Sequence, residues 1–150
     1  MKPRIRFLFL VFAVSVILVV QFAANIALAA DPLLGDWHNQ VDKPSTLTIG
    51  SLDAETGMLR GIYRDGTTGT EGPVVGWVVD PIPGKGDNVK VLSFTVQWSK
   101  FGSVQGWTGY LRNDPKTAVP TLYMQWNLAR SNSDYDWDHI LANQDRFTQK

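Results

Sequence analysis

The feature that most constrains the fold of this chain is a two-residue alternation of apolar and polar side chains. In 89–98 the even positions from Leu92 onward are apolar and their odd neighbours are polar, with Lys90 as the exception. The segment 121–128 alternates in the same way. Such alternation is typical of strands that bury one face. No helical period longer than two turns follows Asp31, so the pattern predicts an all-β domain.

Turn signals rich in Asp, Asn, Pro and Gly separate the alternating segments. They predict eight strands, at 35–41, 45–51, 57–64, 73–79, 88–98, 104–113, 120–130 and 141–149. A longer loop is expected at 131–140, with a short helical turn from Tyr135 to His139. Short antiparallel strands joined by tight sequential turns indicate an eight-stranded up-and-down β-barrel, with a β-sandwich as the alternative.

The first thirty residues have the three parts of a secretory signal peptide in order. A basic head is followed by an apolar run at 7–20 and by small residues at 27–30. The alternative is a membrane anchor, but the run is short for the ~20 apolar residues that a span needs. We therefore expect a signal peptide at 1–29 and one domain at 30–150. The protein would be secreted or periplasmic, with no membrane attachment after cleavage.

Charge and cysteine content exclude several classes of function. The chain has 14 basic and 14 acidic residues, and three of the basic ones lie in the predicted signal peptide. The domain that remains is mildly acidic, which argues against nucleic acid or anionic lipid as partners. The absence of cysteine excludes disulfides, a thiol nucleophile and a cysteine-ligated metal. Such an exported domain depends on core packing and on oligomerisation for its stability.

No catalytic or metal-binding pattern is present in the sequence. His38 and His139 lie outside any nucleophile or metal-ligand motif. The acidic run at 134–138 resembles a calcium loop only superficially, because the glycine that such a loop requires is replaced. A two-carboxylate hydrolase built on Asp65 and Asp145 has no supporting acid-tuning pattern. We therefore predict a protein that is not an enzyme and has no metal and no cofactor.

Aromatic motifs at regular intervals give the chain its resemblance to a known family. All six tryptophans follow the signal peptide, where they form either a core or a binding wall. The motifs are Gly35-Asp36-Trp37-His38-Asn39, Gly57 to Tyr63, Phe94 to Trp98, Trp107-Thr108-Gly109-Tyr110, Met124 to Leu128 and Asp145-Arg146-Phe147-Thr148. In order and spacing the chain resembles avidin and streptavidin over its whole mature length. That resemblance implies an avidin-like barrel that binds biotin without chemistry.

The resemblance also implies roles for individual residues. Asn39, Ser45 and Tyr63 would donate hydrogen bonds to the ureido oxygen of biotin. Asp145 would accept one from a ureido N–H group. Each such bond is stronger in a dry pocket than in water.

Aromatic walls follow from the same resemblance. Trp98, Trp107 and Trp126 would form the apolar box around the ligand, and alternation independently places them on inward positions. Trp137 resembles the tryptophan that one subunit lends to the site of its neighbour. A homodimer or homotetramer is therefore expected. Ser103 would help to hold the biotin carboxylate.

Two residues depart from the family pattern. Asp65 replaces a Ser or Thr, and it could accept the second ureido N–H while placing two acids near one ligand, which raises one pKa. Gln105 stands where a small hydroxyl usually meets the biotin sulfur. These departures leave open an alternative in which the barrel is an interaction or inhibitor module, or carries another small ligand.

Overall fold

The computed structural model describes residues 31–84, 86 and 89–149, and the predicted signal peptide lies outside them. Eight strands and two short 3-10 helices make up its regular structure. They are β1 (Gly35–Asn39), β2 (Thr46–Leu52), β3 (Met58–Arg64), β4 (Glu71–Val79), β5 (Lys90–Trp98), η1 (Ser99–Phe101), β6 (Ser103–Asn113), β7 (Pro120–Arg130), η2 (Asp136–Asp138) and β8 (Ile140–Gln149). In this part of the chain no helix has the length and apolar character to cross a membrane.

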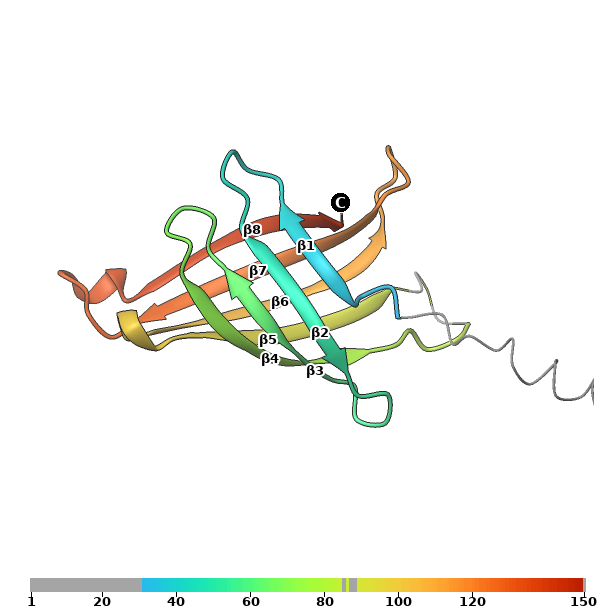
Figure 1. Cartoon of the computed structure of the whole chain (residues 1–150), viewed down its shortest axis with the longest axis horizontal. Coiled ribbons are helices and arrows are strands. Elements are labelled where there is room, and N and C mark those ends of the chain that lie inside the picture. The colour runs from blue at the N-terminus through green and yellow to red at the C-terminus, as the bar shows by residue number, and fades with distance from the viewer. Residues whose placement is uncertain (1–30, 85, 87–88, 150) are drawn as a thin grey trace, which may run out of the picture. The chain divides into compact units, whose positions relative to one another are not determined.

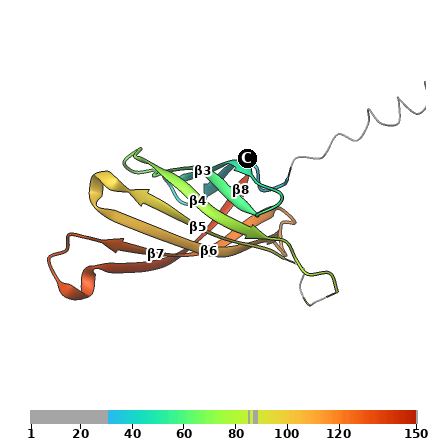
Figure 2. The same cartoon turned by 90° about the horizontal axis from the view of Figure 1, so that it is seen from below.

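The strands close into one barrel in sequence order (Figures 1 and 2). Each strand pairs antiparallel with the next, and β8 returns to pair with β1, so that Asn39 lies opposite Phe147. Closure leaves no unpaired edge strand, which removes a route to aggregation. The predicted eight-stranded up-and-down barrel is confirmed, and the sandwich alternative is wrong. The short turn expected after Tyr135 is also present, as η2.

Alternation correctly predicts which side chains face the barrel interior. On β5 the side chains of Leu92, Phe94, Val96 and Trp98 are all buried, while the residues between them are exposed. The exception, Lys90, extends its side chain to ion pairs with Asp31 and Asp80, at 2.6 and 3.0 Å. An amphipathic side chain can bury its stem while its charged group stays paired.

The two ends of the barrel differ in chemistry. Successive strands are antiparallel, so the β1–β2, β3–β4, β5–β6 and β7–β8 connections share one end, which we call the polar end (Figure 1). The opposite, apolar end is filled by Leu33, which is fully buried and accepts a 2.9 Å hydrogen bond from Trp37 Nε1. Asp31 holds Leu33 in this position by accepting a 2.9 Å hydrogen bond from its backbone N–H. The barrel interior is therefore closed at this end by an apolar side chain.

Three hairpin loops share one hydrogen-bonding pattern. They begin at Asp53, Asp65 and Asp114, and in each the aspartate Oδ1 accepts from two backbone N–H groups and a threonine hydroxyl. Short carboxylate side chains stabilise turns by this type of local bond. Each loop then places one residue in the left-handed region, and the third loop uses Ala118 (φ 57°) where the others use glycine.

Candidate ligand-binding site

The polar end of the barrel gathers most of the predicted site residues on its inner surface. Asn39 ends β1, Ser45 immediately precedes β2, and Tyr63 lies near the end of β3. All three side chains are buried. Buried polar groups need hydrogen-bond partners, so each of their donors and acceptors can be followed to a partner or to the barrel interior.

Asn39 and Ser45 are held by the loop that joins their strands. Asn39 Oδ1 accepts a 2.7 Å bond from the backbone N–H of Ser45. The asparagine therefore turns its Nδ2 donors toward the interior. This bond also explains why β1 ends at Asn39, two residues earlier than the sequence predicts.

Gly66 was missed as a site residue in the sequence, where it reads only as a turn. Its backbone N–H donates a 3.0 Å bond to Ser45 Oγ, which leaves the serine hydroxyl proton free to donate elsewhere. A Cβ at Gly66 would lie 2.1 Å from the carbonyl oxygen of Lys43 and 2.6 Å from Pro44. Only glycine fits this contact between the β1–β2 and β3–β4 loops.

Tyr63 remains a hydroxyl donor over the whole physiological pH range. Its pKa is raised to about 12, chiefly by burial; the nearby Ser45 hydroxyl opposes this rise, and the carboxylates of Asp145 and Asp65 add to it. Its ring packs edge-on against Trp98, with centroids 5.8 Å apart, and against Trp107 at 5.5 Å. The hydroxyl is thus held in a mostly apolar wall.

Asp145 is the one carboxylate that the inner face of β8 presents to this cluster. It lies opposite Met124 of β7. Burial raises its pKa above the ordinary aspartate value, and the nearby polar groups of Asn39 and Trp126 only partly oppose this rise. The pKa of Asp145 is therefore raised by burial, and the effect of two neighbouring acids that the sequence predicts stays a prediction.

Three tryptophans line the interior beside these polar groups. Trp107 is almost fully buried, with its ring centroid 6.0 Å from that of Trp126. The Trp98 ring packs edge-on against Tyr63. Its Nε1 donates a 3.2 Å hydrogen bond to Gln105 Oε1. The structure therefore brings these three rings and Gln105 into one cluster with the polar residues.

Two further features of the wall were not apparent from the sequence. Trp107 Nε1 is buried and has no hydrogen-bond partner among the described residues. Such an unpaired donor is costly unless a ligand or water accepts from it. Phe147, fully buried, packs edge-on against Trp107 and Tyr63 at 5.5 and 6.3 Å. Its position opposite Asn39 on β1 makes it the base on which both rings rest.

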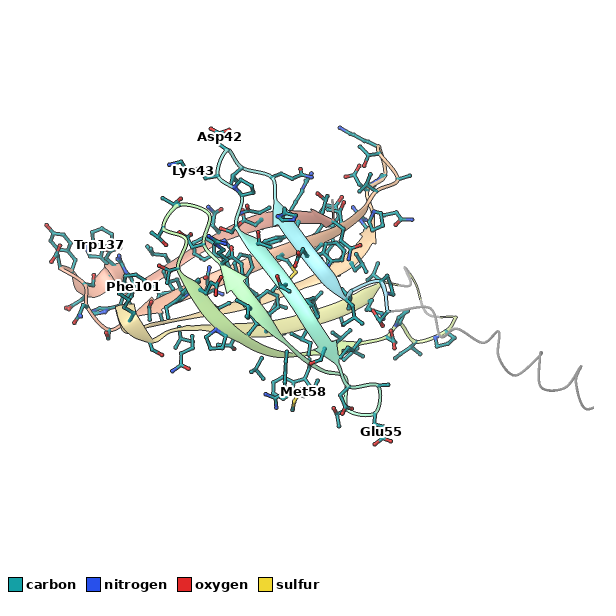
Figure 3. The ribbon with its side chains drawn as sticks, in the orientation of Figure 1. Asp42, Lys43, Glu55, Met58, Phe101 and Trp137 are labelled. Atoms are coloured by element: carbon teal, nitrogen blue, oxygen red, sulfur yellow. The ribbon has the colours of Figure 1, made fainter. Side chains whose placement is uncertain are left out.

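The remaining predicted site residues lie at the margin of this cluster. Ser103 begins β6 opposite Trp98 and is half-buried at the rim. The Oδ1 atom of Asp65 is committed to its own loop, with its shortest bond, 2.7 Å, from the backbone of Thr68. Trp137 is 77 % exposed and points away from the barrel at its polar end (Figure 3). Ser103 thus lies beside Trp98 at the edge of the cluster, whereas the Trp137 side chain is directed to solvent.

An aromatic and basic cluster occupies the outer face of β6, β7 and β8. The rings of Tyr110 and Tyr123 stack with centroids 5.3 Å apart. The guanidinium groups of Arg112 and Arg146 each lie 5.0 Å from the Tyr123 ring, whose hydroxyl donates to Asp114 at 2.7 Å. The outward direction of these side chains separates them from the interior site.

Comparison with known proteins agrees with this architecture. The chain is similar to a biotin binding protein from chicken (28 % identity, 79 % of this chain and 97 % of that chain, TM-score 0.64). It is also similar to a shwanavidin variant in complex with biotin (29 %, 81 % and 100 %, TM-score 0.60). Bradavidin gives 27 % identity over 78 % of this chain and 81 % of its own, with a TM-score of 0.62.

A search of curated proteins gave no match. The Avidin family profile, in contrast, matches residues 29–150, which include the whole barrel. On the evidence of this match and of the eight-stranded barrel, the chain belongs to the avidin family.

Proposed function

We propose that this protein binds biotin at the polar end of its barrel and does not transform it. The observation that carries the proposal is the convergence of buried donors and one half-buried carboxylate, Asp145, on a tryptophan-lined interior. A planar ureido group needs donors at its oxygen and an acceptor at its N–H groups, and a fused apolar ring needs aromatic walls. Of the solved structures that this chain resembles, one is a complex with biotin and another is a biotin binding protein.

The polar groups have unused hydrogen-bond donors that a ureido oxygen requires. Asn39 offers Nδ2, because its Oδ1 is occupied by Ser45 N–H. Ser45 offers its hydroxyl proton, because its oxygen accepts from Gly66. Tyr63 offers a hydroxyl that stays protonated. We infer three donors at the ureido oxygen, with Asp145 accepting from one ureido N–H.

The walls and the rim take the rest of the ligand. Trp98, Trp107 and Trp126 pack against the bicyclic ring, with Gln105 beside its sulfur. Ser103, at the rim, donates to the carboxylate of the tail. Asp65 accepts the second ureido N–H through Oδ2, since Oδ1 holds the loop.

Assembly of two or four copies is part of the same proposal. The exposed Trp137 stacks on Tyr135, at 5.5 Å, and in the proposed assembly it would enter the site of a second subunit. Figure 3 shows it at the same end of the barrel as Phe101, which is also exposed. Aromatic and arginine side chains are enriched at protein interfaces. The protein would act outside the cytoplasm, after loss of residues 1–29.

A second candidate is favoured by Gln105 and Asp65. Gln105 is larger than a hydroxyl side chain and is tied to Trp98, and one oxygen of Asp65 is occupied in its loop. Both features would suit a barrel that carries another small ligand, or that serves as an interaction or inhibitor module. This candidate predicts a folded protein whose binding is insensitive to biotin.

A thermal melt with and without excess biotin tests the proposal. A ligand that binds only the folded state raises Tm by an amount set by its concentration relative to Kd. We expect a large rise for the protein produced from the full coding sequence, and a clearly smaller rise in Asp145→Ala. Glu71→Ala, at an exposed acid on β4, is the matched control and should keep the rise. A well-folded protein with no rise would refute biotin binding and leave the second candidate.

A further inference from the structure

Gln105 presents a fixed hydrogen-bond donor to the interior of the barrel. It is 8 % exposed, and its Oε1 accepts from Trp98 Nε1 at 3.2 Å. An indole N–H only donates, so the amide oxygen must face Trp98 and the amide NH₂ must face away from it. Among the described residues, this Nε2 group has no hydrogen-bond partner. The amide therefore offers two oriented N–H donors that the fold itself does not use.

The register of β6 gives the depth of this donor in the site. Trp107, Gln105 and Ser103 alternate on the inner face, and two residues of strand span about 6.6 Å. Trp107 packs against Tyr63, which belongs to the proposed ureido subsite, with ring centroids 5.5 Å apart. Ser103 is at the rim. Gln105 thus lies between Trp107 and the rim, where the proposed binding mode puts the far side of the fused ring.

The sulfur of biotin is a poor partner for this donor. A thioether sulfur is a weak acceptor, whereas the amide group needs strong acceptors once water is displaced. A buried N–H left unpaired carries a desolvation penalty, and the same N–H paired with an oxygen does not. An oxygen bonded to the ring sulfur would extend toward Nε2 and accept from it.

We infer that Gln105 tunes this pocket toward a biotin-like cyclic urea whose ring sulfur is oxidised, with biotin S-oxide as the simplest such ligand. The inference rests on the proposed function, since it uses the same site and the same ureido contacts. It assigns Gln105 the role of a specificity-determining residue. The bond from Trp98 makes that indole a positioning residue for the amide.

The geometry also implies a choice between the two S-oxide epimers. Gln105 lies on one wall only, and its orientation is fixed from the Trp98 side. The sulfoxide oxygen points to opposite faces of the ring in the two epimers. Only one epimer can direct that oxygen to Nε2 while the ureido group keeps its contacts with Tyr63 and Asp145. The other epimer gains nothing from the amide.

The test is calorimetric titration of the protein, produced from its full coding sequence, with biotin, each S-oxide epimer and desthiobiotin. Desthiobiotin has no sulfur, so it reports the ureido contacts alone. The quantity of interest is the ratio of Kd for biotin to Kd for the better epimer. Pairing one buried donor changes affinity by about tenfold. We therefore expect this ratio to be about tenfold larger in the natural protein than in Gln105→Thr.

Trp98→Phe provides a second variant that separates positioning from bulk. Without the indole N–H the amide can rotate and present its oxygen, so the ratio should fall and the preference between epimers should weaken. Melts of both variants establish that they are folded. If Gln105→Thr proves unfolded, Trp98→Phe still decides the question.

The outcomes distinguish this inference from the proposed function. Binding of biotin and desthiobiotin with the same S-oxide ratio in the natural protein and both variants overturns the role of Gln105 and leaves the biotin site intact. Failure of all four ligands to bind a folded natural protein overturns both. A larger ratio in the natural protein, confined to one epimer, supports the inference.

Discussion

Substitution of Asp145 should separate ligand affinity from stability. A hydrogen bond to a charged group contributes about 1.5–3 kcal/mol, and a neutral one about 1 kcal/mol. Asp145→Ala removes the acceptor altogether, so biotin affinity should fall about 10- to 150-fold. Asp145→Asn keeps a neutral acceptor, and its loss should be about 2- to 30-fold.

The Asp145→Asn substitution should also stabilise the protein in the absence of ligand. Burial raises the pKa of Asp145 above the ordinary value of 3.8 in the folded state. The folded state therefore holds this proton more tightly than the unfolded state. Stability contributed by Asp145 must then decrease as pH rises from below 3.8 through the folded pKa, and stay level above it. Asp145→Asn removes this loss, so the variant should be the more stable protein at pH 7.

Urea unfolding at several pH values, together with calorimetric titration of biotin, measures both effects. The stability difference between Asp145→Asn and the natural protein should be largest at neutral pH and shrink toward pH 3. Glu71→Gln is the control, because it removes the same charge from an exposed position on β4. Undiminished affinity in Asp145→Asn, or lower stability of that variant at pH 7, would refute the assigned role of this carboxylate.

Three further substitutions test the loops and the base of the site. Gly69→Ala should cost about 1 kcal/mol and Ala118→Gly gain a similar amount in urea unfolding, because both residues are left-handed, at φ 68° and 57°. Opposite signs for this pair are required. Gly66→Ala should force the β1–β2 and β3–β4 loops apart and break the hydrogen bond to Ser45. Biotin binding, measured by titration, should then weaken about fivefold or more. Unchanged affinity would contradict the role of this contact. Phe147→Ala removes a fully buried ring and should destabilise the barrel by about 3–5 kcal/mol, whereas a loss below 1 kcal/mol would show that the neighbouring rings do not depend on it.

Most of the barrel could be predicted from the sequence, because a strand in a closed sheet has only two faces. Once the even-numbered residues from Leu92 to Trp98 are assigned to the barrel interior, the odd-numbered residues between them must face outward, and the structure agrees. The ends of strands were harder to predict. β4 begins at Glu71 and β1 ends at Asn39, since loop hydrogen bonds rather than propensity decide where pairing stops.

The sequence indicates which residues line the site better than it indicates which of them form hydrogen bonds with one another. Inward alternation predicts that Trp98 and Gln105 both face the interior, but no sequence pattern indicates that they bond to each other. A cross-strand bond depends on side-chain rotamers and on barrel shear. Asp65 shows the same limit. Its loop repeats the Asp-x-x-Thr-Gly pattern of the loop at Asp53, but the pattern alone does not show that Oδ1 is committed to the turn while the residue lies beside a ligand site.

The loops at the polar end do more than connect strands. Their backbone N–H groups occupy the hydrogen-bond acceptors that would otherwise face the ureido oxygen of a ligand. Asn39 gives its oxygen to Ser45 N–H, and Ser45 gives its oxygen to Gly66 N–H. Each bond leaves the donor side of the residue facing the interior. Donors that are oriented before binding need no ordering when a ligand arrives, which reduces the entropic cost of association. By the same logic Trp98 orients Gln105, and that amide, built in the same way as the ureido donors, requires an acceptor of its own.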